Sequence, residues 1–295
     1  MPDPTEPTAP TEPTAPNRRP APAPYPPGQR ERIVDLLRGE WVVVADLLAG
    51  LPEGAWSAPA LPGWDVHDVV AHLVGTERML SGDSAPEVAP AVVDAAHVHN
   101  PIARLNEAWV VDLRGRSHAE LLDDFRAVTS TRLAALCAMT DADFAAPSWT
   151  PVGNDTYGRF MQVRVFDTWM HEQDVRSATG MPGHEDGPVA EEALDEVVRA
   201  LGYLVGKRAG APDGTSVTVE LTGPLHRRLH VVVAGRARVV DSLDGPPTAC
   251  LSLGSSLFLR LAGGRTEPSA AHPAVELSGD LELARRVADT LPFTI

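Results

Sequence analysis

The spacing of hydrophobic residues changes once along this chain of 295 residues, and the change separates two kinds of predicted structure. In the first part, hydrophobic side chains recur at steps of three and four, as in "RERIVDLLRGEWVVVADLLAGL". This spacing is typical of amphipathic helices. From Ser216 onward the pattern alternates in steps of two, as in "SVTVEL", which indicates strands. We therefore predict a helical domain followed by a small α+β domain.

Four long helices are predicted in the first part of the chain. Asp65 is a good N-cap for the second, and Ser117 with Glu120 forms a capping box before the third. Gly180 ends the fourth. The expected helices cover about 30–49, 65–80, 117–136 and 156–178, with a shorter helix around 101–111. Long helices with hydrophobic stripes indicate an antiparallel four-helix bundle.

The second part begins with a helix at about 188–207. The segments "RLHVVVAG", "ARVV", "ACLSL" and "AVELSG" are interpreted as strands, and "SSLFLRLAGG" and "DLELARRVADTL" as helices. The first 27 residues repeat "TEPTAP" and are rich in Pro and Thr, so they are expected to be a disordered, extended tail. The predicted domains are the tail at 1–27, the helical bundle at 28–182 and the α+β domain at 188–295.

Composition and charge argue against several classes of protein. A net charge of −15 disfavours binding to nucleic acid or to an anionic membrane, because both require clustered Lys and Arg. No hydrophobic run approaches the roughly 20 residues of a membrane span, and the N-terminus lacks the pattern of a signal peptide. We expect a soluble cytoplasmic protein. Cys137 and Cys250 are too far apart for a CxxC motif, and both are predicted to be small buried side chains.

The stretch "DTWMHEQDVR" (167–176) carries an unusual density of ionisable residues within a predicted helix. Hydrophobic residues surround it on several sides, which indicates that the helix is largely buried. Asp167 and His171 are four residues apart and therefore share one face of the helix. Buried ionisable groups persist when they are paired or bind a metal, so this face is a candidate metal site.

A third ligand is expected from another helix, and His72 in "DVVAHLVGTE" is the best candidate. Two histidines and a carboxylate with one open position are typical of catalytic zinc and of non-haem Fe(II) sites. The alternative interpretations are a surface ion pair for Asp167 and His171 and an ordinary core histidine for His72. Asp174 is expected either to orient His171 or to pair with a nearby arginine, Arg164 or Arg176.

Other ionisable residues are not expected to be ligands. Glu77 lies five residues after His72 and therefore off its face of the helix. His97 and His99 lie in an irregular stretch and are predicted to be solvent-exposed loop residues. In the fourth helix, Glu172, Gln173 and Arg176 point away from the candidate site and are expected to need only solvent, caps or ion pairs.

Three segments resemble a known family. "LPGWDVHDVVAHLVGTE", "HNPIARLNEAWV" and "RVFDTWMHEQDVR" are similar to motifs of the mycothiol-dependent maleylpyruvate isomerase-like family of the DinB metal-binding superfamily, including its actinobacterial members. The resemblance covers about residues 30–180 well and extends to the C-terminal part, which looks like a sterol-carrier-like α+β domain.

The resemblance implies a site and a class of reaction. The family's metal ligands match His72, Asp167 and His171, although the isomerase that names the family has Glu where this chain has Asp. It implies a zinc ion or another divalent metal, mycothiol as a thiol cosubstrate and a small electrophilic substrate that is isomerised or joined to the thiol. It also implies an assisting arginine in the C-terminal domain, for which Arg260 and Arg265 are the candidates. The alternative functions are non-catalytic binding of a metal or of an apolar ligand.

Overall fold

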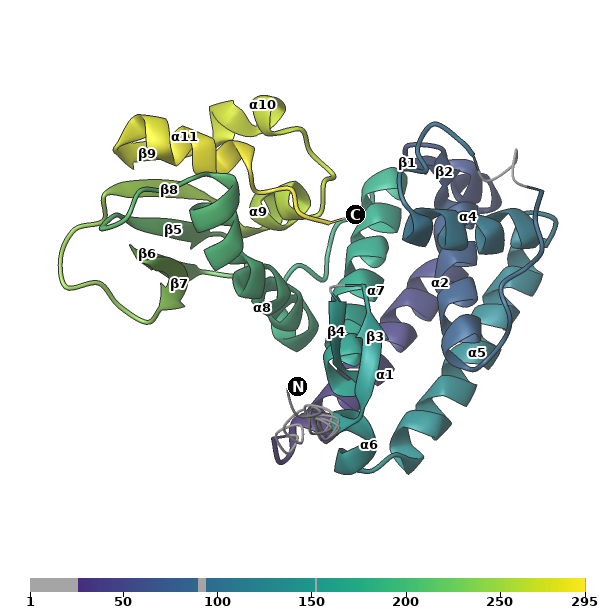
Figure 1. Cartoon of the computed structure of the whole chain (residues 1–295). Coiled ribbons are helices and arrows are strands. Elements are labelled where there is room, and N and C mark those ends of the chain that lie inside the picture. The colour runs from purple at the N-terminus through teal and green to yellow at the C-terminus, as the bar shows by residue number, and fades with distance from the viewer. Residues whose placement is uncertain (1–25, 90–93, 152, 295) are drawn as a thin grey trace, which may run out of the picture.

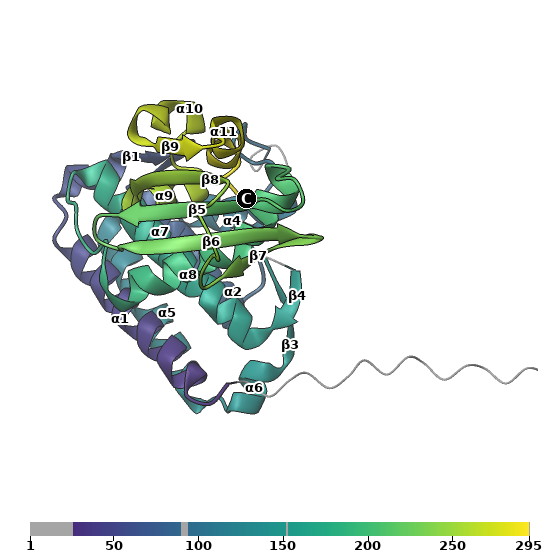
Figure 2. The same ribbon diagram turned by 90° about the vertical axis from the view of Figure 1, so that its left-hand side faces the viewer.

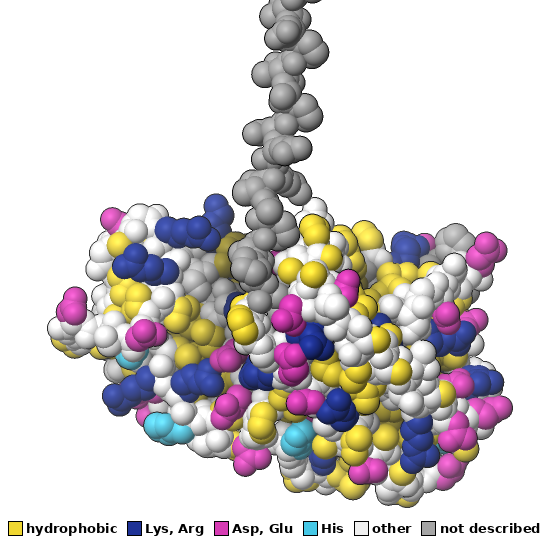
Figure 3. All heavy atoms as spheres, turned by 90° about the horizontal axis from the view of Figure 1, so that it is seen from below, with side chains coloured by type: hydrophobic (Ala, Val, Ile, Leu, Met, Phe, Trp, Pro, Cys, Tyr) yellow, Lys and Arg dark blue, Asp and Glu magenta, His cyan; other side chains and the backbone are white. Residues whose placement is uncertain are grey.

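The computed structural model describes residues 26–89, 94–151 and 153–294, and the predicted N-terminal tail lies almost wholly outside them (Figure 1). Among these residues, no helix combines the length and the hydropathy that a membrane crossing requires. Figure 3 shows acidic and basic side chains interspersed over one face of the molecule. That face carries no continuous basic patch of the kind that binds phosphates.

The first part of the chain is a helical bundle, as predicted. Helix α2 contacts α4, α5 and α7, and α1 contacts α5 and α7. The helices of this part are α1 (Gln29–Ala49), α2 (Val66–Leu80), α4 (Pro101–Leu113), α5 (His118–Ala138), the short α6 (Asp141–Ala145) and α7 (Tyr157–Thr179), with a 3-10 turn η1 at Glu53–Ser57. The two helices that carry the candidate ligands, α2 and α7, therefore lie against each other in the interior of the molecule.

The ends of these helices follow the capping signals in the sequence. The Asp65 side chain accepts a hydrogen bond from the amide of Asp68 at the start of α2. Ser117 and Glu120 form the predicted capping box at the start of α5. Gly180 ends α7 in the left-handed conformation, with φ 66°, which glycine adopts without steric cost. Local chemistry therefore sets the lengths of the helices and places His72 and His171 well inside them.

The second part of the chain is an α+β domain, as predicted. Its five-stranded sheet has the order β7-β6-β5-β8-β9, in which β5 and β8 are parallel and the other neighbours are antiparallel. Helices α8, α9 and α11 pack against the sheet, and Figure 2 shows β5, β6 and β8 from the face opposite to α8 and α9.

The bounds of the elements in this part are as follows. The strands are β5 (Ser216–Thr222), β6 (Arg227–Ala234), β7 (Arg236–Val240), β8 (Ala249–Gly254) and β9 (Glu276–Gly279). The helices are α8 (Gly187–Tyr203), a π-helical turn η2 (Leu204–Arg208), α9 (Ser255–Ala262), α10 (Pro268–Ala271), a 3-10 turn η3 (His272–Ala274) and α11 (Leu281–Asp289).

The structure differs from the sequence analysis in two respects. Two short strand pairs were not predicted: a hairpin of β3 (Pro147–Thr150) and β4 (Gly153–Thr156) before α7, and a pair of β1 (Pro59–Leu61) and β2 (Trp64–Asp65) before α2. The predicted burial of the cysteines is wrong. Cys137 is exposed because it follows the buried Leu136 on α5 and falls off the hydrophobic stripe, and Cys250 is only partly buried.

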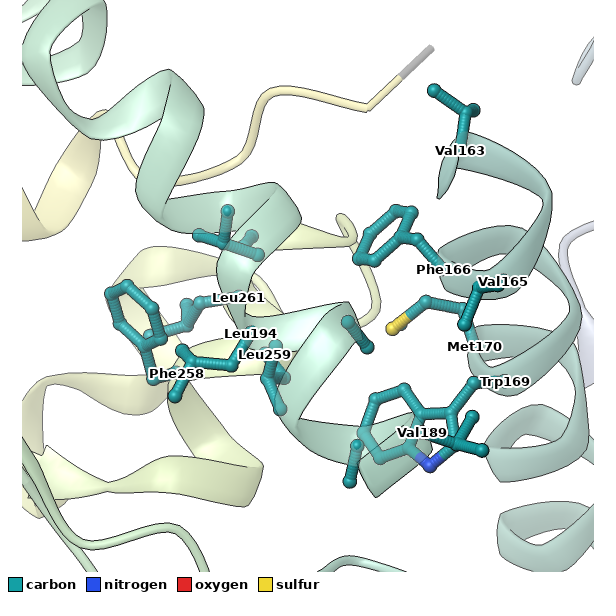
Figure 4. Close-up of a cluster of buried hydrophobic side chains, with 14 of the residues drawn as sticks. Val163, Val165, Phe166, Trp169, Met170, Val189, Leu194, Phe258, Leu259 and Leu261 are labelled. Atoms are coloured by element: carbon teal, nitrogen blue, oxygen red, sulfur yellow. The ribbon is translucent and has the colours of Figure 1, made fainter. Parts of the chain in front are cut away.

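Hydrophobic side chains join the two parts of the chain. Phe166, Trp169 and Met170 of α7 point toward α8 and α9, and they meet Val189 of α8 and Leu259 of α9 (Figure 4). Burial of each such side chain contributes about 1.5–3 kcal/mol. This contact explains why α7 is hydrophobic on several sides, since one side faces the bundle and another faces the C-terminal domain.

Candidate metal centre

The structure brings His72, Asp167 and His171 together. Nε2 of His72 lies 3.5 Å from Oδ2 of Asp167, and Nε2 of His171 lies 3.7 Å from Oδ1 of the same carboxylate. The centroids of the two imidazole rings are 4.7 Å apart. One donor atom from each residue lies within 4.8 Å of the others. Two imidazoles and a carboxylate thus converge from α2 and α7 on one point.

His72 fits a metal ligand better than a satisfied core histidine. Its side chain is buried, and neither ring nitrogen has a hydrogen-bond partner in the described part of the chain. Burial lowers the pKa of His72, and the neighbouring Asp167 carboxylate opposes this only in part. A neutral imidazole is the form that binds a metal. An unpaired ring nitrogen in the interior costs free energy, which a bound cation would recover.

Asp167 is held in its ionised form. Burial alone would raise its pKa, but the Arg164 guanidinium and the two imidazoles outweigh burial and place the pKa of Asp167 well below its usual range. Arg164 donates a hydrogen bond to Oδ2 of the carboxylate. The side chain of Asp167 is 31% exposed, whereas those of His72 and His171 are almost inaccessible. Solvent therefore reaches this cluster from the side of Asp167.

A second carboxylate connects His171 to the C-terminal domain. Nδ1 of His171 lies 3.0 Å from Oδ2 of Asp174, and Arg265 binds the same carboxylate through Nε at 3.1 Å and Nη2 at 2.8 Å. Burial would raise the pKa of Asp174, but Arg265 and His171 lower it overall. An ionised Asp174 accepts a hydrogen bond from Nδ1–H of His171, which leaves Nε2 with a free lone pair toward Asp167.

A buried ion cluster fixes Arg164, and no residue spacing along the chain predicts it. Both oxygens of Glu77 are used: Oε1 accepts from Nε and Nη2 of Arg164 at 3.0 and 2.8 Å, and Oε2 accepts from Nε of Arg132 at 3.0 Å. Arg132 also donates to the Tyr157 hydroxyl at 2.8 Å. Glu77 thus fixes Arg164, which in turn donates to Asp167.

Trp64 covers the two imidazoles. Its ring centroid lies 5.4 Å from that of His72 and 6.4 Å from that of His171. The indole Nε1 donates to Oε2 of Glu107 at 2.8 Å, and Nε2 of His97 lies 2.9 Å from the same oxygen. The prediction that His97 is a solvent-exposed loop residue is therefore wrong, because its side chain is only 22% exposed and pairs with the buried Glu107. His99 is exposed, as predicted.

The two candidate arginines of the C-terminal domain lie in different places. Arg265 reaches the metal cluster through Asp174. Arg260 instead lines a cavity of about 310 Å³ between α7, α9 and the segment that links the two domains, together with Trp169 and Arg176. Trp169 and Arg176 belong to a different side of α7 from Asp167 and His171. The geometry thus brings Arg265, and not Arg260, to the candidate site.

Comparison with known proteins gives two matching family models. Residues 37–176 match the mycothiol maleylpyruvate isomerase N-terminal domain, and residues 191–286 match the C-terminal domain of the same family. Two uncharacterized proteins of Mycobacterium tuberculosis, from strains CDC 1551 and H37Rv, are 30% identical over 146 residues, which is 49% of this chain and 55% of each relative. The chain thus spans about half the length of these curated relatives.

Two solved structures share the fold. They are crystal structures of the mycothiol-dependent maleylpyruvate isomerase and of a single-residue variant of it. Their TM-scores are 0.52 and 0.53, and each is 18% identical to this chain. The alignment covers 84% of this chain and 92% of the other in both cases. The likeness includes both parts of the molecule, and at this identity it concerns the fold alone.

Proposed function

The chain belongs to the mycothiol maleylpyruvate isomerase family, and on that premise we propose that it is a metal-dependent enzyme that uses a low-molecular-weight thiol such as mycothiol. The proposed reaction is isomerisation of a small electrophilic substrate or transfer of the thiol to it. One observation carries the proposal: His72 is a buried imidazole without a hydrogen-bond partner in the described residues, and it faces Asp167 and His171.

The residues present suit a divalent cation, and zinc is the proposed one. His72, Asp167 and His171 would hold it, which gives the two-imidazole, one-carboxylate donor set of catalytic zinc sites. A metal bound there lowers the pKa of a thiol or water and so supplies a nucleophile at neutral pH. The thiol and substrate would approach from the exposed side of Asp167, while Trp64 shields the imidazoles on another side.

The chain's own residues prepare this site in two ways. Asp174 orients His171 by accepting a hydrogen bond from its Nδ1–H, and Arg265 is a positioning residue that holds Asp174. Because Arg265 belongs to the C-terminal domain, the packing of that domain on the bundle affects the orientation of a ligand on α7. Arg164 keeps Asp167 ionised by a direct hydrogen bond. The thiol would add reversibly to a double bond of the substrate, which permits isomerisation, or would remain attached, which is transfer.

Metal analysis and a screen of thiol-dependent reactions test the proposal. We expect about one divalent ion per chain in the purified protein and turnover only when a thiol is present. His171→Ala is expected to lose the ion and at least about 100-fold in activity, because the metal contributes several kcal/mol to the transition state. The matched control is His226→Ala, which removes an exposed histidine of the C-terminal domain and should leave both quantities unchanged.

Two outcomes would contradict the proposal. A protein that contains no metal and gains none on dialysis against Zn²⁺ has no such centre. A protein that binds one ion through His171 but turns over no thiol-dependent reaction is better described by the second interpretation, non-catalytic metal binding.

Asp174→Asn tests the role of the carboxylate behind His171. The amide keeps the shape of the side chain but loses the charge that Arg265 pairs with and can donate a hydrogen bond to Nδ1 of His171, which favours the wrong tautomer. We expect a 10–100-fold loss of metal affinity or activity, the usual effect of losing such a partner. Competition with a chelator measures the affinity. An unchanged affinity would show that Asp174 does not orient the ligand.

A further inference from the structure

A second group of potential ligands lies on another side of α7. Glu40 of α1, Glu172 of α7 and His184 of the segment between α7 and α8 place one donor atom each within 4.8 Å of the others. Both glutamate side chains are completely buried, and the His184 side chain is 24% exposed. None of these residues takes part in the function proposed above.

Glu40 lacks a hydrogen-bond partner. Neither of its carboxylate oxygens makes a hydrogen bond within the described residues, and the nearest cationic atom is Nδ1 of His184, 3.7 Å from Oε2. Glu172 is better supplied: Nε of Arg176 lies 2.6 Å from its Oε1, and Nδ1 of His184 lies 2.7 Å from its Oε2. Arg176 also donates to the carbonyl of Met181. Arg176 therefore pairs with Glu172, and no arginine pairs with Glu40 among the described residues.

Burial of an unpaired carboxylate is too costly to persist without compensation. Burial and the neighbouring Glu172 raise the pKa of Glu40 well above its usual range, because both disfavour its charged form, and a cation bound by the two carboxylates would relieve this. We propose that Glu40, Glu172 and His184 bind a second divalent cation. Two carboxylates and one imidazole suit Mn²⁺, Zn²⁺ and similar ions. The partly exposed side of His184 provides the route of entry.

The proposed ion would tie the link between the domains to the bundle. His184 has a left-handed backbone, with φ 56°, which is uncommon for a residue other than glycine. Its carbonyl accepts hydrogen bonds from Trp169 Nε1 at 2.9 Å and from Gln173 Nε2 at 3.3 Å, so the segment is already fixed against α7. A cation held by α1, α7 and His184 would fasten the segment at a second point and so help to set the position of the C-terminal domain.

Metal binding in a His72→Leu background tests this site independently of the first one. The chain is stripped with a chelator, dialysed against Mn²⁺ and analysed for bound metal. We expect about one Mn²⁺ per His72→Leu chain and none after the further change Glu40→Gln, which keeps the shape of the side chain and removes its charge. The matched control is Glu191→Gln, an exposed glutamate of α8, which should leave the bound Mn²⁺ unchanged.

His184→Gln is the second variant, because His184 is the one partly exposed side chain of the three. Loss of one of three donors should weaken Mn²⁺ binding at least about tenfold. Bound Mn²⁺ should also raise the melting temperature of the His72→Leu chain, and Glu40→Gln should abolish that rise. If the His72→Leu chain binds no Mn²⁺, or if Glu40→Gln leaves binding unchanged, a proton or a charged His184 compensates Glu40 and the proposal is overturned.

Discussion

Glu77→Gln is expected to lower the free energy of unfolding by about 3–5 kcal/mol, the usual cost of removing one partner from a buried ion pair. Glu77, Arg132 and Arg164 are all almost inaccessible to solvent, and the carboxylate is the shared acceptor of both guanidinium groups. Without its charge, Arg132 keeps only neutral acceptors, and Asp167 is the one charged partner that Arg164 keeps among the described residues. Urea unfolding followed by circular dichroism measures the change.

The control for Glu77→Gln is Glu282→Gln. Glu282 also pairs with an arginine, Arg286, but its side chain is 86% exposed and the pair lies on the surface of α11. Exposed pairs of this kind contribute at most about 1 kcal/mol and often nothing measurable. A similar, small effect of both substitutions would show that the ion cluster around Glu77 does not stabilise the fold. A large effect at Glu77 alone would identify it as the buried support of the candidate metal centre.

The fold was predictable from the sequence because its signals are local. The steps of three and four, the cap at Asp65 and the capping box at Ser117 concern residues within one or two helical turns of each other. The hairpin at 147–156 was missed because its Pro, Gly and Asn residues are also typical of loops. The burial of Cys137 was misjudged because the usual burial of free cysteine was applied without regard to its place on α5.

The candidate site was predictable in part for the same reason. Asp167 and His171 are four residues apart on one helix, and His72 stood out as a histidine among hydrophobic residues, so the group could be assembled from spacing. The residues that hold these three side chains in place could not be predicted from spacing. Arg265 meets Asp174 across the domain interface, 91 residues away in the sequence, and Arg132 meets Glu77 across 55. Contacts between helices at such separations depend on packing that no spacing rule encodes.

Different sides of α7 face different neighbours, which determines where its hydrophobic and its charged side chains lie. The helix has one side for the first cluster of ligands, another for the C-terminal domain and a third for Glu172. This explains why "DTWMHEQDVR" mixes residue types so densely: Trp169 and Met170 fill the domain interface, while Asp167 and His171 face α2. The stretch is polar although it is buried, because Asp167, Glu172 and Asp174 each pair with a side chain from outside α7.

His72→Leu is expected to have opposite effects on activity and on stability. Leucine fills a similar volume but cannot bind a metal, so we expect loss of the bound ion and at least about 100-fold loss of thiol-dependent activity. The metal-free protein should become more stable, because the substitution removes two buried ring nitrogens that have no hydrogen-bond partner among the described residues. Each such group costs about 1–3 kcal/mol when it is left unsatisfied.

Unfolding of the stripped wild-type and His72→Leu proteins, compared with activity after reloading with Zn²⁺, measures both effects. Replacing a residue that stabilises the fold lowers the free energy of unfolding of the metal-free protein, whereas replacing a residue whose role is to bind a ligand does not. The control is Leu73→Ala, at the neighbouring buried position of α2, which should lose about 2–5 kcal/mol of stability by leaving a cavity. If stripped His72→Leu were instead destabilised as strongly as Leu73→Ala, His72 would be a packing residue of α2. In that case α2 would supply no ligand to the proposed metal centre.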